Sequence, residues 1–289
     1  MSARTVEPSA EALSASQRLR GIATRAATAS AHHLTAAFRS PMLVQRKGSA
    51  HDLVTEHDVA SEAIIRDAIL REEPDSTVLG EEGGAVGDGR VVWHVDPIDG
   101  TVNFAHGIAF WCVSVAAAVD GEVVAGVVLD PVGGHEFAAD LGGAWLDGAA
   151  LTPRASRTET AAAVVSSFPG AVDLASHGEA ALEATEALVH GFATTRAMGS
   201  GALGLAHVAA GWADATFDLH THPWDVAAGS LLVRRSGGRY VGFVDGRPDE
   251  DPCSLHLAPA YYATGPGADY PTLDAVVRRL SAIGAAAGG

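Results

Sequence analysis

Two apolar segments of this chain, residues 112–119 and 122–129, are separated only by Asp120-Gly121. An Asp-Gly pair between two strand-like segments predicts a tight β-hairpin, because both residues tolerate the positive φ angles of a two-residue turn. The interiors of both segments consist of small and β-branched residues without a charge. We therefore expect a sheet whose central strands are buried, and the rest of the chain must cover it.

The segments around this hairpin predict how the sheet is covered. A further buried strand is expected at residues 91–95, and helices are expected before it at 10–38 and 59–73. After about residue 155, strand-like and helical segments alternate. The strands are expected at residues 164–167, 192–198 and 215–218, and the helices at 179–190, 202–212 and 223–235. The pattern predicts an α+β half over residues 1–155 and an α/β half over 156–289.

The charge of the chain excludes several classes of partner. Its 289 residues carry 19 Lys and Arg against 35 Asp and Glu, a formal net charge of −16 at pH 7. Proteins that bind nucleic acids or anionic membranes need a cationic surface, so we expect neither partner. The two cysteines, Cys112 and Cys253, are too few for a disulfide framework. No apolar run reaches the roughly 18 residues of a membrane span. Because so few cysteines suit a reducing compartment, we expect a cytoplasmic protein.

The residues suited to chemistry occur in three acidic segments. Gly80-Glu81-Glu82 follows a strand-like segment, Asp96-Pro97-Ile98-Asp99-Gly100-Thr101 follows the strand at 91–95, and Trp224-Asp225 stands at the start of a helix. Each segment places a carboxylate at the end of a regular element, where the backbone fixes its direction. Cation binding is therefore the first hypothesis for these segments.

The middle segment has two carboxylates that can converge. Asp96 and Asp99 are three residues apart around Pro97, whose ring fixes φ. If a helix begins at Gly100-Thr101, its free N–H groups form an anion site beside the carboxylates. Two carboxylates and a backbone carbonyl are ligands of the kind that Mg²⁺ prefers. Taken alone, the composition Asp-Pro-x-Asp-Gly is also typical of a simple turn.

Four motifs in a fixed order carry a resemblance to a known family. They are Leu53-Val54-Thr55-Glu56-His57-Asp58, Gly80-Glu81-Glu82, the run from Asp96 to Thr101, and Trp224-Asp225-Val226-Ala227-Ala228-Gly229. In this order they resemble the inositol monophosphatase family of Mg²⁺-dependent, lithium-sensitive phosphomonoesterases, which is related to fructose-1,6-bisphosphatase. The resemblance spans residues 47 to about 238. It implies a layered α-β-α-β-α sandwich, a homodimer and hydrolysis of a small phosphate monoester.

The resemblance also implies the metal ligands. Glu81, Asp96 and the carbonyl of Ile98 match the ligands of a first Mg²⁺ ion. Asp96, Asp99 and Asp225 match those of a second, and Glu81 also serves a third, looser ion. Two ions roughly 3.5–4 Å apart can activate water and stabilise the leaving alkoxide. Two to three Mg²⁺ ions are thus the expected cofactors.

The remaining matches imply catalytic and substrate-binding roles. Asp58 and Thr101 match the pair that orients and deprotonates the attacking water, a role to which Glu81 contributes. The backbone of Gly100 and Thr101 would hold the phosphate, and Lys47 matches a lysine near the metals. The segment lining the substrate pocket is matched by Gly199, Ser200 and Gly201.

One position departs from the inositol-cleaving members of the family. They have a glutamate seven residues before the Trp-Asp aspartate, where it binds a ring hydroxyl, whereas this chain has Asp218. The side chain is one methylene shorter, and sites that read hydroxyls discriminate strongly. We therefore expect a substrate other than myo-inositol phosphate, such as a cyclitol, sugar or histidinol phosphate. A nucleotide or a bisphosphate is the alternative.

Three other interpretations compete with this one. The run Gly199-Ser200-Gly201-Ala202-Leu203-Gly204 satisfies the G-x-G-x-x-G fingerprint of nicotinamide-dependent oxidoreductases. Its preceding strand is too polar for a buried parallel strand, which argues against that function. His220 and His222, with Asp218, could bind a transition metal, but no third N or S ligand is evident and a polar pocket edge is favoured. A catalytically idle binding subunit is the last alternative, and the intact acidic set argues against it.

Overall fold

The protein, in a computed structural model, is described over residues 8–46, 53–152 and 155–286. Its larger sheet has the strand order β10-β9-β8-β7-β6-β5-β3-β4. A short pair, β1 (Val44–Arg46) and β2 (Leu53–Thr55), lies apart from it. The strands of the larger sheet are β3 (Ser76–Gly80), β4 (Gly84–Val86), β5 (Val91–Asp99), β6 (Cys112–Val119), β7 (Glu122–Asp130), β8 (His135–Asp140), β9 (Gly143–Leu146) and β10 (Ala149–Ala150).

The predicted hairpin is confirmed as β6 and β7 at the centre of this sheet. Val119 pairs with Glu122 across the turn. Asp120 and Gly121 have φ angles of +52° and +86°, which a two-residue hairpin turn requires. The sheet is therefore anchored by the segment that predicted it.

Strand β5 is longer than expected, and the interpretation of its end as a simple turn is wrong. The strand continues from Val95 through Asp99. Asp96 pairs with Ser114 and Asp99 with Cys112, so β5 has one extra residue here and bulges. A bulge bends a strand and redirects its side chains. Both aspartates of this bulged segment line the same cavity at the end of the strand.

A second sheet forms from the C-terminal half, with the order β12-β11-β13-β16-β14-β15. Strand β12 is at its edge, parallel to β11, and this explains the polar residues Thr194, Thr195 and Arg196. The strands are β11 (Ala163–Ser166), β12 (Thr194–Ala197), β13 (Ala215–Asp218), β14 (Arg239–Val244), β15 (Arg247–Asp249) and β16 (Ala260–Thr264).

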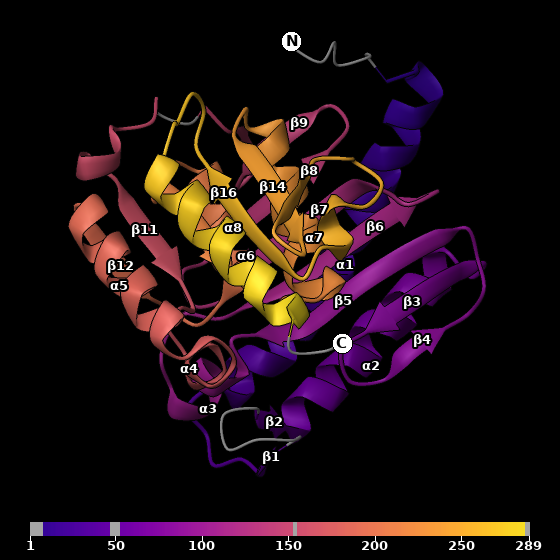
Figure 1. The fold of residues 1–289 in the computed structure, drawn as a ribbon. Helices are drawn as coiled ribbons and strands as arrows, with labels where there is room; N and C mark the ends of the chain where they lie inside the picture. Colours follow the sequence, from indigo (N-terminus) through magenta and orange to yellow (C-terminus); the bar gives the residue numbers. More distant parts are fainter. Residues whose placement is uncertain (1–7, 47–52, 153–154, 287–289) are drawn as a thin grey trace.

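Helices cover both sheets in layers (Figure 1). Helices α1 and α2 pack on one face of the larger sheet, α6 and α7 lie between the two sheets, and α5 and α8 pack together beside the second sheet. The helices are α1 (Ala10–Ala37), α2 (Glu56–Glu72), α3 (Thr101–His106), α4 (Ala171–His177), α5 (Glu179–Gly191), α6 (Gly201–Ala209), α7 (Pro223–Arg235) and α8 (Pro271–Ala286). The predicted α-β-α-β-α sandwich is confirmed.

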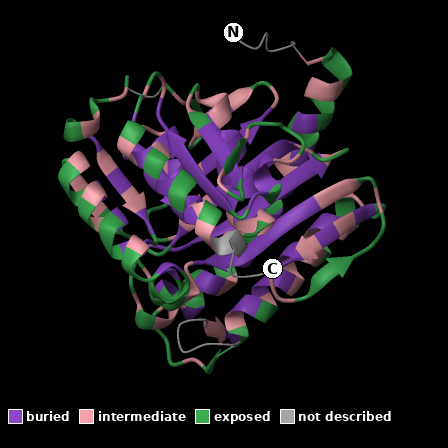
Figure 2. Ribbon diagram, in the orientation of Figure 1, coloured by how far each residue is buried: buried purple, intermediate pink, exposed green. Residues whose placement is uncertain are grey.

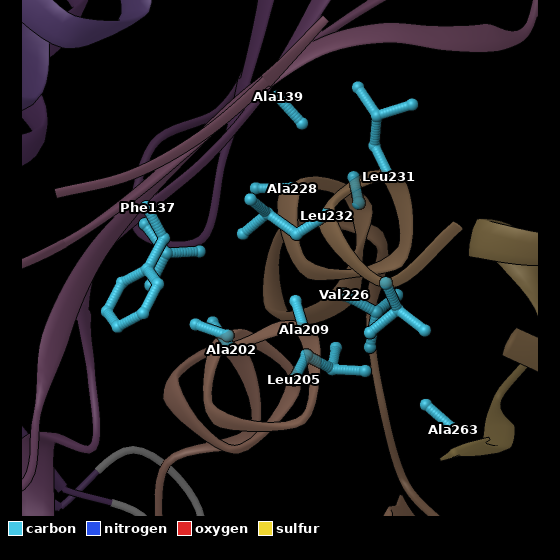
Figure 3. Packing of buried hydrophobic residues seen from close by; sticks show 14 of the residues in the cluster. Phe137, Ala139, Ala202, Leu205, Ala209, Val226, Ala228, Leu231, Leu232 and Ala263 are labelled. Carbon is cyan, nitrogen blue, oxygen red and sulfur yellow. The ribbon is translucent and has the colours of Figure 1, made fainter. Parts of the chain in front are cut away.

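The core between the sheets joins both halves of the chain. Phe137 of β8, Leu205 of α6, Leu231 of α7 and Ala263 of β16 belong to one cluster of buried residues, in which the two helices lie between the strands (Figure 3). Burial is deepest in the central strands, while the outer helices expose one side (Figure 2). A division into two domains near residue 155 stays a prediction. Across the described ranges, no helix combines the length and the apolarity of a membrane span.

Candidate active site

A cavity of about 750 Å³ opens where the bulged end of β5 meets the starts of α3 and α7 and the end of β13. Two residues expected at the site, Asp58 and Ser200, are buried behind its wall. A third, Lys47, lies outside the described residues. The expected residues that line the cavity are Glu81, Asp96, Ile98, Asp99, Gly100, Thr101, Gly199, Gly201, Asp218 and Asp225.

Asp96 and Asp99 stand at the centre of the acidic group. Burial, and then the negative charges of Glu81, Asp99 and Asp225, raise the pKa of Asp96 well above its usual value. Burial and the charge of Asp225 raise the pKa of Asp99 to about 6. Carboxylates that raise one another's pKa in a cavity form a site that a cation would stabilise.

The carboxylate of Asp99 is held from the C-terminal half. Its Oδ2 accepts hydrogen bonds from the Ser200 hydroxyl at 2.5 Å and from the Ala202 N–H at 2.7 Å. Ser200 is also the N-cap of α6. Ser200 is not among the residues that line the cavity, and its hydroxyl orients Asp99, which does line it; the expected role of Ser200 in substrate binding stays a prediction. The glycine-rich segment from Gly199 to Gly204 therefore contains the start of helix α6.

Asp58 and Thr101, which the resemblance matches to a water-activating pair, are hydrogen-bonded to each other. The Thr101 hydroxyl lies 2.9 Å from Asp58 Oδ1 and 3.0 Å from the Ile98 carbonyl oxygen. The other oxygen of Asp58 accepts hydrogen bonds from the N–H and the hydroxyl of Thr55, the N-cap of α2. The N-cap of α2 thus holds the buried carboxylate of Asp58 in place, with Oδ1 directed at the Thr101 hydroxyl.

The start of α3 depends on Gly100. This residue has a φ of +98°, and a Cβ on it would lie 3.0 Å from the Gly199 carbonyl oxygen. Both features favour glycine. The helix expected at Thr101 is present and places its first N–H groups beside the carboxylates of the cavity wall.

Asp225 reaches the cavity from the first turn of α7. Its Oδ2 accepts the N–H of His222 at 2.7 Å, which caps the helix. Pro223 occupies the first turn, where its missing N–H costs nothing. The sequence signals for this helix start were sufficient to place the carboxylate.

Sequence reasoning missed Glu62, which positions the loop that carries Glu81. Its buried carboxylate accepts the N–H groups of Glu82 at 2.7 Å and Gly83 at 2.9 Å. A Cβ on Gly80 would lie 2.3 Å from its carboxyl carbon. Glu62 occupies the buried side of α2, and a charged residue on a core face was the signal available in the sequence.

Asp218 lines the same cavity as the acidic group. Its Oδ1 accepts the Ser167 N–H at 2.9 Å, and its Oδ2 lies 3.5 Å from the Tyr261 hydroxyl. Burial raises the pKa of Asp218 to about 7. The carboxyl group of Asp218 therefore titrates near neutral pH, and no pattern in the sequence indicated this.

The two histidines beyond Asp218 do not act together. His222 stacks on Trp224 with ring centroids 4.8 Å apart. His220 lines the cavity, as the favoured interpretation expected, and its Nε2 lies 3.5 Å from Asp173 Oδ1. Asp173 was not among the predicted residues.

Comparison with known proteins identifies the family of this chain. The sequence model of the inositol monophosphatase family matches residues 15–270. Nus factor SuhB of Escherichia coli strain K12 is 36% identical over 230 residues, which cover 78% of this chain and 85% of the relative. The chain therefore belongs to the inositol monophosphatase family.

Solved structures show the same fold. Extragenic suppressor protein suhB from Bartonella henselae superposes with a TM-score of 0.79 at 29% identity, over 91% of this chain and 98% of that one. Inositol monophosphatase from Anabaena gives a TM-score of 0.74 at 28% identity, over 91% and 95%. Family membership supports phosphatase activity in general.

Proposed function

We propose that this protein hydrolyses a small phosphate monoester in a Mg²⁺-dependent reaction. The observation that carries the proposal is the acidic group in one cavity, where buried carboxylates raise the pKa of Asp96 and Asp99. Such a group next to the start of a helix suits a cation and a phosphate together.

The donor set fits magnesium. The ligands we propose are the carboxylates of Glu81, Asp96, Asp99 and Asp225 and the carbonyl of Ile98, all of which line the cavity. They are oxygen donors, as Mg²⁺ requires. When bound, two to three Mg²⁺ ions would lower the pKa of water, neutralise phosphoryl oxygens and stabilise the leaving alkoxide.

Asp58 and Thr101 would accept the proton of the attacking water. The Thr101 hydroxyl can donate to Asp58 Oδ1 and accept a hydrogen bond from water on its cavity side. Because the other oxygen of Asp58 is already engaged by Thr55, the proton would pass to the oxygen that faces Thr101. The N–H groups of Gly100 and Thr101 would hold the phosphate.

Removal and return of the metal tests this function. We expect phosphate release from a panel of phosphomonoesters to stop when the protein is stripped with EDTA and to return with added Mg²⁺. Lithium should inhibit at millimolar concentration, as the resemblance implies. Full turnover by exhaustively stripped protein would refute the proposal.

The position of Asp218 supports a substrate other than myo-inositol phosphate. Its Oδ1 is already engaged by the Ser167 N–H, so the side chain has less reach toward a ring hydroxyl. One related structure, SaIMPase-II at 25% identity, is described as bound to inositol monophosphate. We propose a cyclitol, sugar or histidinol phosphate for this chain, with a nucleotide or bisphosphate as the alternative.

A second candidate function comes from the relatives. Those from Escherichia coli and Vibrio cholerae carry the name Nus factor SuhB, at 36% and 34% identity. If this chain shares that role, wild type and Asp96→Asn should both replace the Escherichia coli protein in its own host. The expectations of a cytoplasmic location and of no nucleic-acid partner stay predictions from composition.

A further inference from the structure

Beside the acidic group, the cavity wall contains a second cluster of a different chemical kind. Asp173 and His177 come from α4, and His220 comes from the segment after β13. Among the described residues, one ligand atom from each of the three lies within 4.8 Å of the others. Asp173 and His220 line the cavity. The proposed phosphatase reaction uses none of them.

The hydrogen bonds of His177 leave its Nε2 available. Its Nδ1 lies 3.0 Å from the carbonyl oxygen of Asp173 one turn earlier. Because a carbonyl can only accept, Nδ1 carries the proton, and the neutral ring has its lone pair on Nε2. Metal-binding histidines are commonly oriented by this kind of hydrogen bond to a backbone carbonyl.

Asp173 is oriented in the same way. Its Oδ2 accepts the N–H of Gly170 at 2.7 Å, which fixes the carboxylate at the start of α4. Its Oδ1 is the oxygen that lies 3.5 Å from His220 Nε2. The two α4 side chains, four residues apart, therefore present one oxygen and one nitrogen on the same face of the helix.

The spacing between His220 and Asp173 is compatible with two ligands of one ion. At 3.5 Å the two atoms are farther apart than in an ordinary N–H···O hydrogen bond. Two ligands of a tetrahedral zinc ion, at bond lengths near 2.1 Å, are about 3.4 Å apart. Burial lowers the pKa of His220, although Asp173 opposes the shift, so its ring is mainly neutral at pH 7.

We propose that Asp173, His177 and His220 bind a divalent transition-metal ion, with Zn²⁺ as the probe, in the wall of the catalytic cavity. Two imidazoles and one carboxylate form a known ligand set for such ions, and three protein ligands leave a position open to water or another ligand. Mg²⁺ prefers oxygen donors, so this site differs in chemistry from the acidic group.

The test is calorimetric titration of Zn²⁺ into the full chain in the presence of excess Mg²⁺, which competes with Zn²⁺ for the carboxylates of the acidic group. Its readout is binding, so it is independent of phosphatase activity. We expect one equivalent of Zn²⁺ to bind wild type and the Asp96→Asn variant. His177→Ala and His220→Ala should each weaken this binding at least about 100-fold.

The control is His190→Ala, which removes an exposed imidazole of α5 and should leave binding unchanged. His177 is buried, so its variant is judged only if its melting curve matches wild type. The side chain of His220 is 42% exposed, so its loss disturbs the fold less than the loss of His177. The His220→Ala variant alone decides the proposal if His177→Ala does not fold. Equal Zn²⁺ affinity in His220→Ala and wild type, or no Zn²⁺ binding by wild type, would overturn the proposal.

Discussion

Glu62→Gln should weaken magnesium binding although Glu62 does not line the cavity. In the wild type its two carboxylate oxygens accept the N–H groups of Glu82 and Gly83, directly after Glu81. A glutamine keeps one acceptor and turns an NH₂ group toward the other N–H. The loop that presents Glu81 to the cavity thus loses one of its two anchors.

The magnitude follows from the lost hydrogen bond. A hydrogen bond to a charged group contributes about 1.5–3 kcal/mol, which corresponds to roughly 10- to 100-fold in an equilibrium constant. If the loop must be ordered for Glu81 to bind the ion, that factor appears in the Mg²⁺ affinity. We expect at least about a tenfold rise in the Mg²⁺ concentration that gives half-maximal activity.

The assay is phosphate release against Mg²⁺ concentration at saturating substrate. The control is Glu72→Gln on the same helix, whose exposed carboxylate binds Arg25; it should match wild type. Both variants must first show a cooperative melting transition. A folded Glu62→Gln protein with wild-type Mg²⁺ dependence would refute the reasoning that Glu62 positions Glu81.

Three further predictions concern Asp218 and the oligomeric state, and the last of them rests on the family resemblance alone. Burial raises the pKa of Asp218 to about 7 in the folded protein, above its ordinary value of 3.8. The native state therefore keeps this proton to higher pH than the unfolded chain does, so the free energy of unfolding falls as pH rises from about 4 to 7, by at most about 4 kcal/mol. In EDTA, Asp218→Asn should therefore be more stable than wild type at pH 8, and the gap should shrink toward pH 4; parallel denaturation curves would contradict this. Asp218→Glu should gain in kcat/KM on myo-inositol 1-phosphate and lose on the preferred substrate, because the added methylene extends the carboxylate; unchanged kcat/KM on both substrates would contradict this. Light scattering should give twice the 29.5 kDa chain mass, and a monomer mass at micromolar concentration would exclude the homodimer.

Local patterns were enough to predict the central fold. The Asp120-Gly121 turn fixed the hairpin because its signal lies within two residues and its flanking segments are uniformly apolar. The start of α7 could be predicted equally well, since Pro223 and Asp225 are both short-range signals of a helix start. The end of β5 was not, because a bulge depends on the partner strand as much as on its own residues.

The supporting residues of the site were beyond sequence reasoning for a related reason. Glu62 acts on backbone N–H groups about 20 positions away, and any residue type can supply such a group. Ser200 meets Asp99 from the other half of the chain. His177 meets His220 only once α4 and the segment after β13 lie side by side. Contacts between residues that are far apart in the chain produce no regular spacing that could be recognised in the sequence.

The most direct test of the central claim is the kcat/KM of Asp96→Asn for phosphate release at saturating Mg²⁺, measured beside Asp147→Asn. Asp96 belongs to the acidic group in the cavity, whereas Asp147 is a surface carboxylate that binds His135. The account predicts that Asp96→Asn retains almost no activity while it stays folded, and that Asp147→Asn retains nearly all of it. Wild-type turnover by a folded Asp96→Asn protein would contradict the claim that these carboxylates bind the catalytic metal.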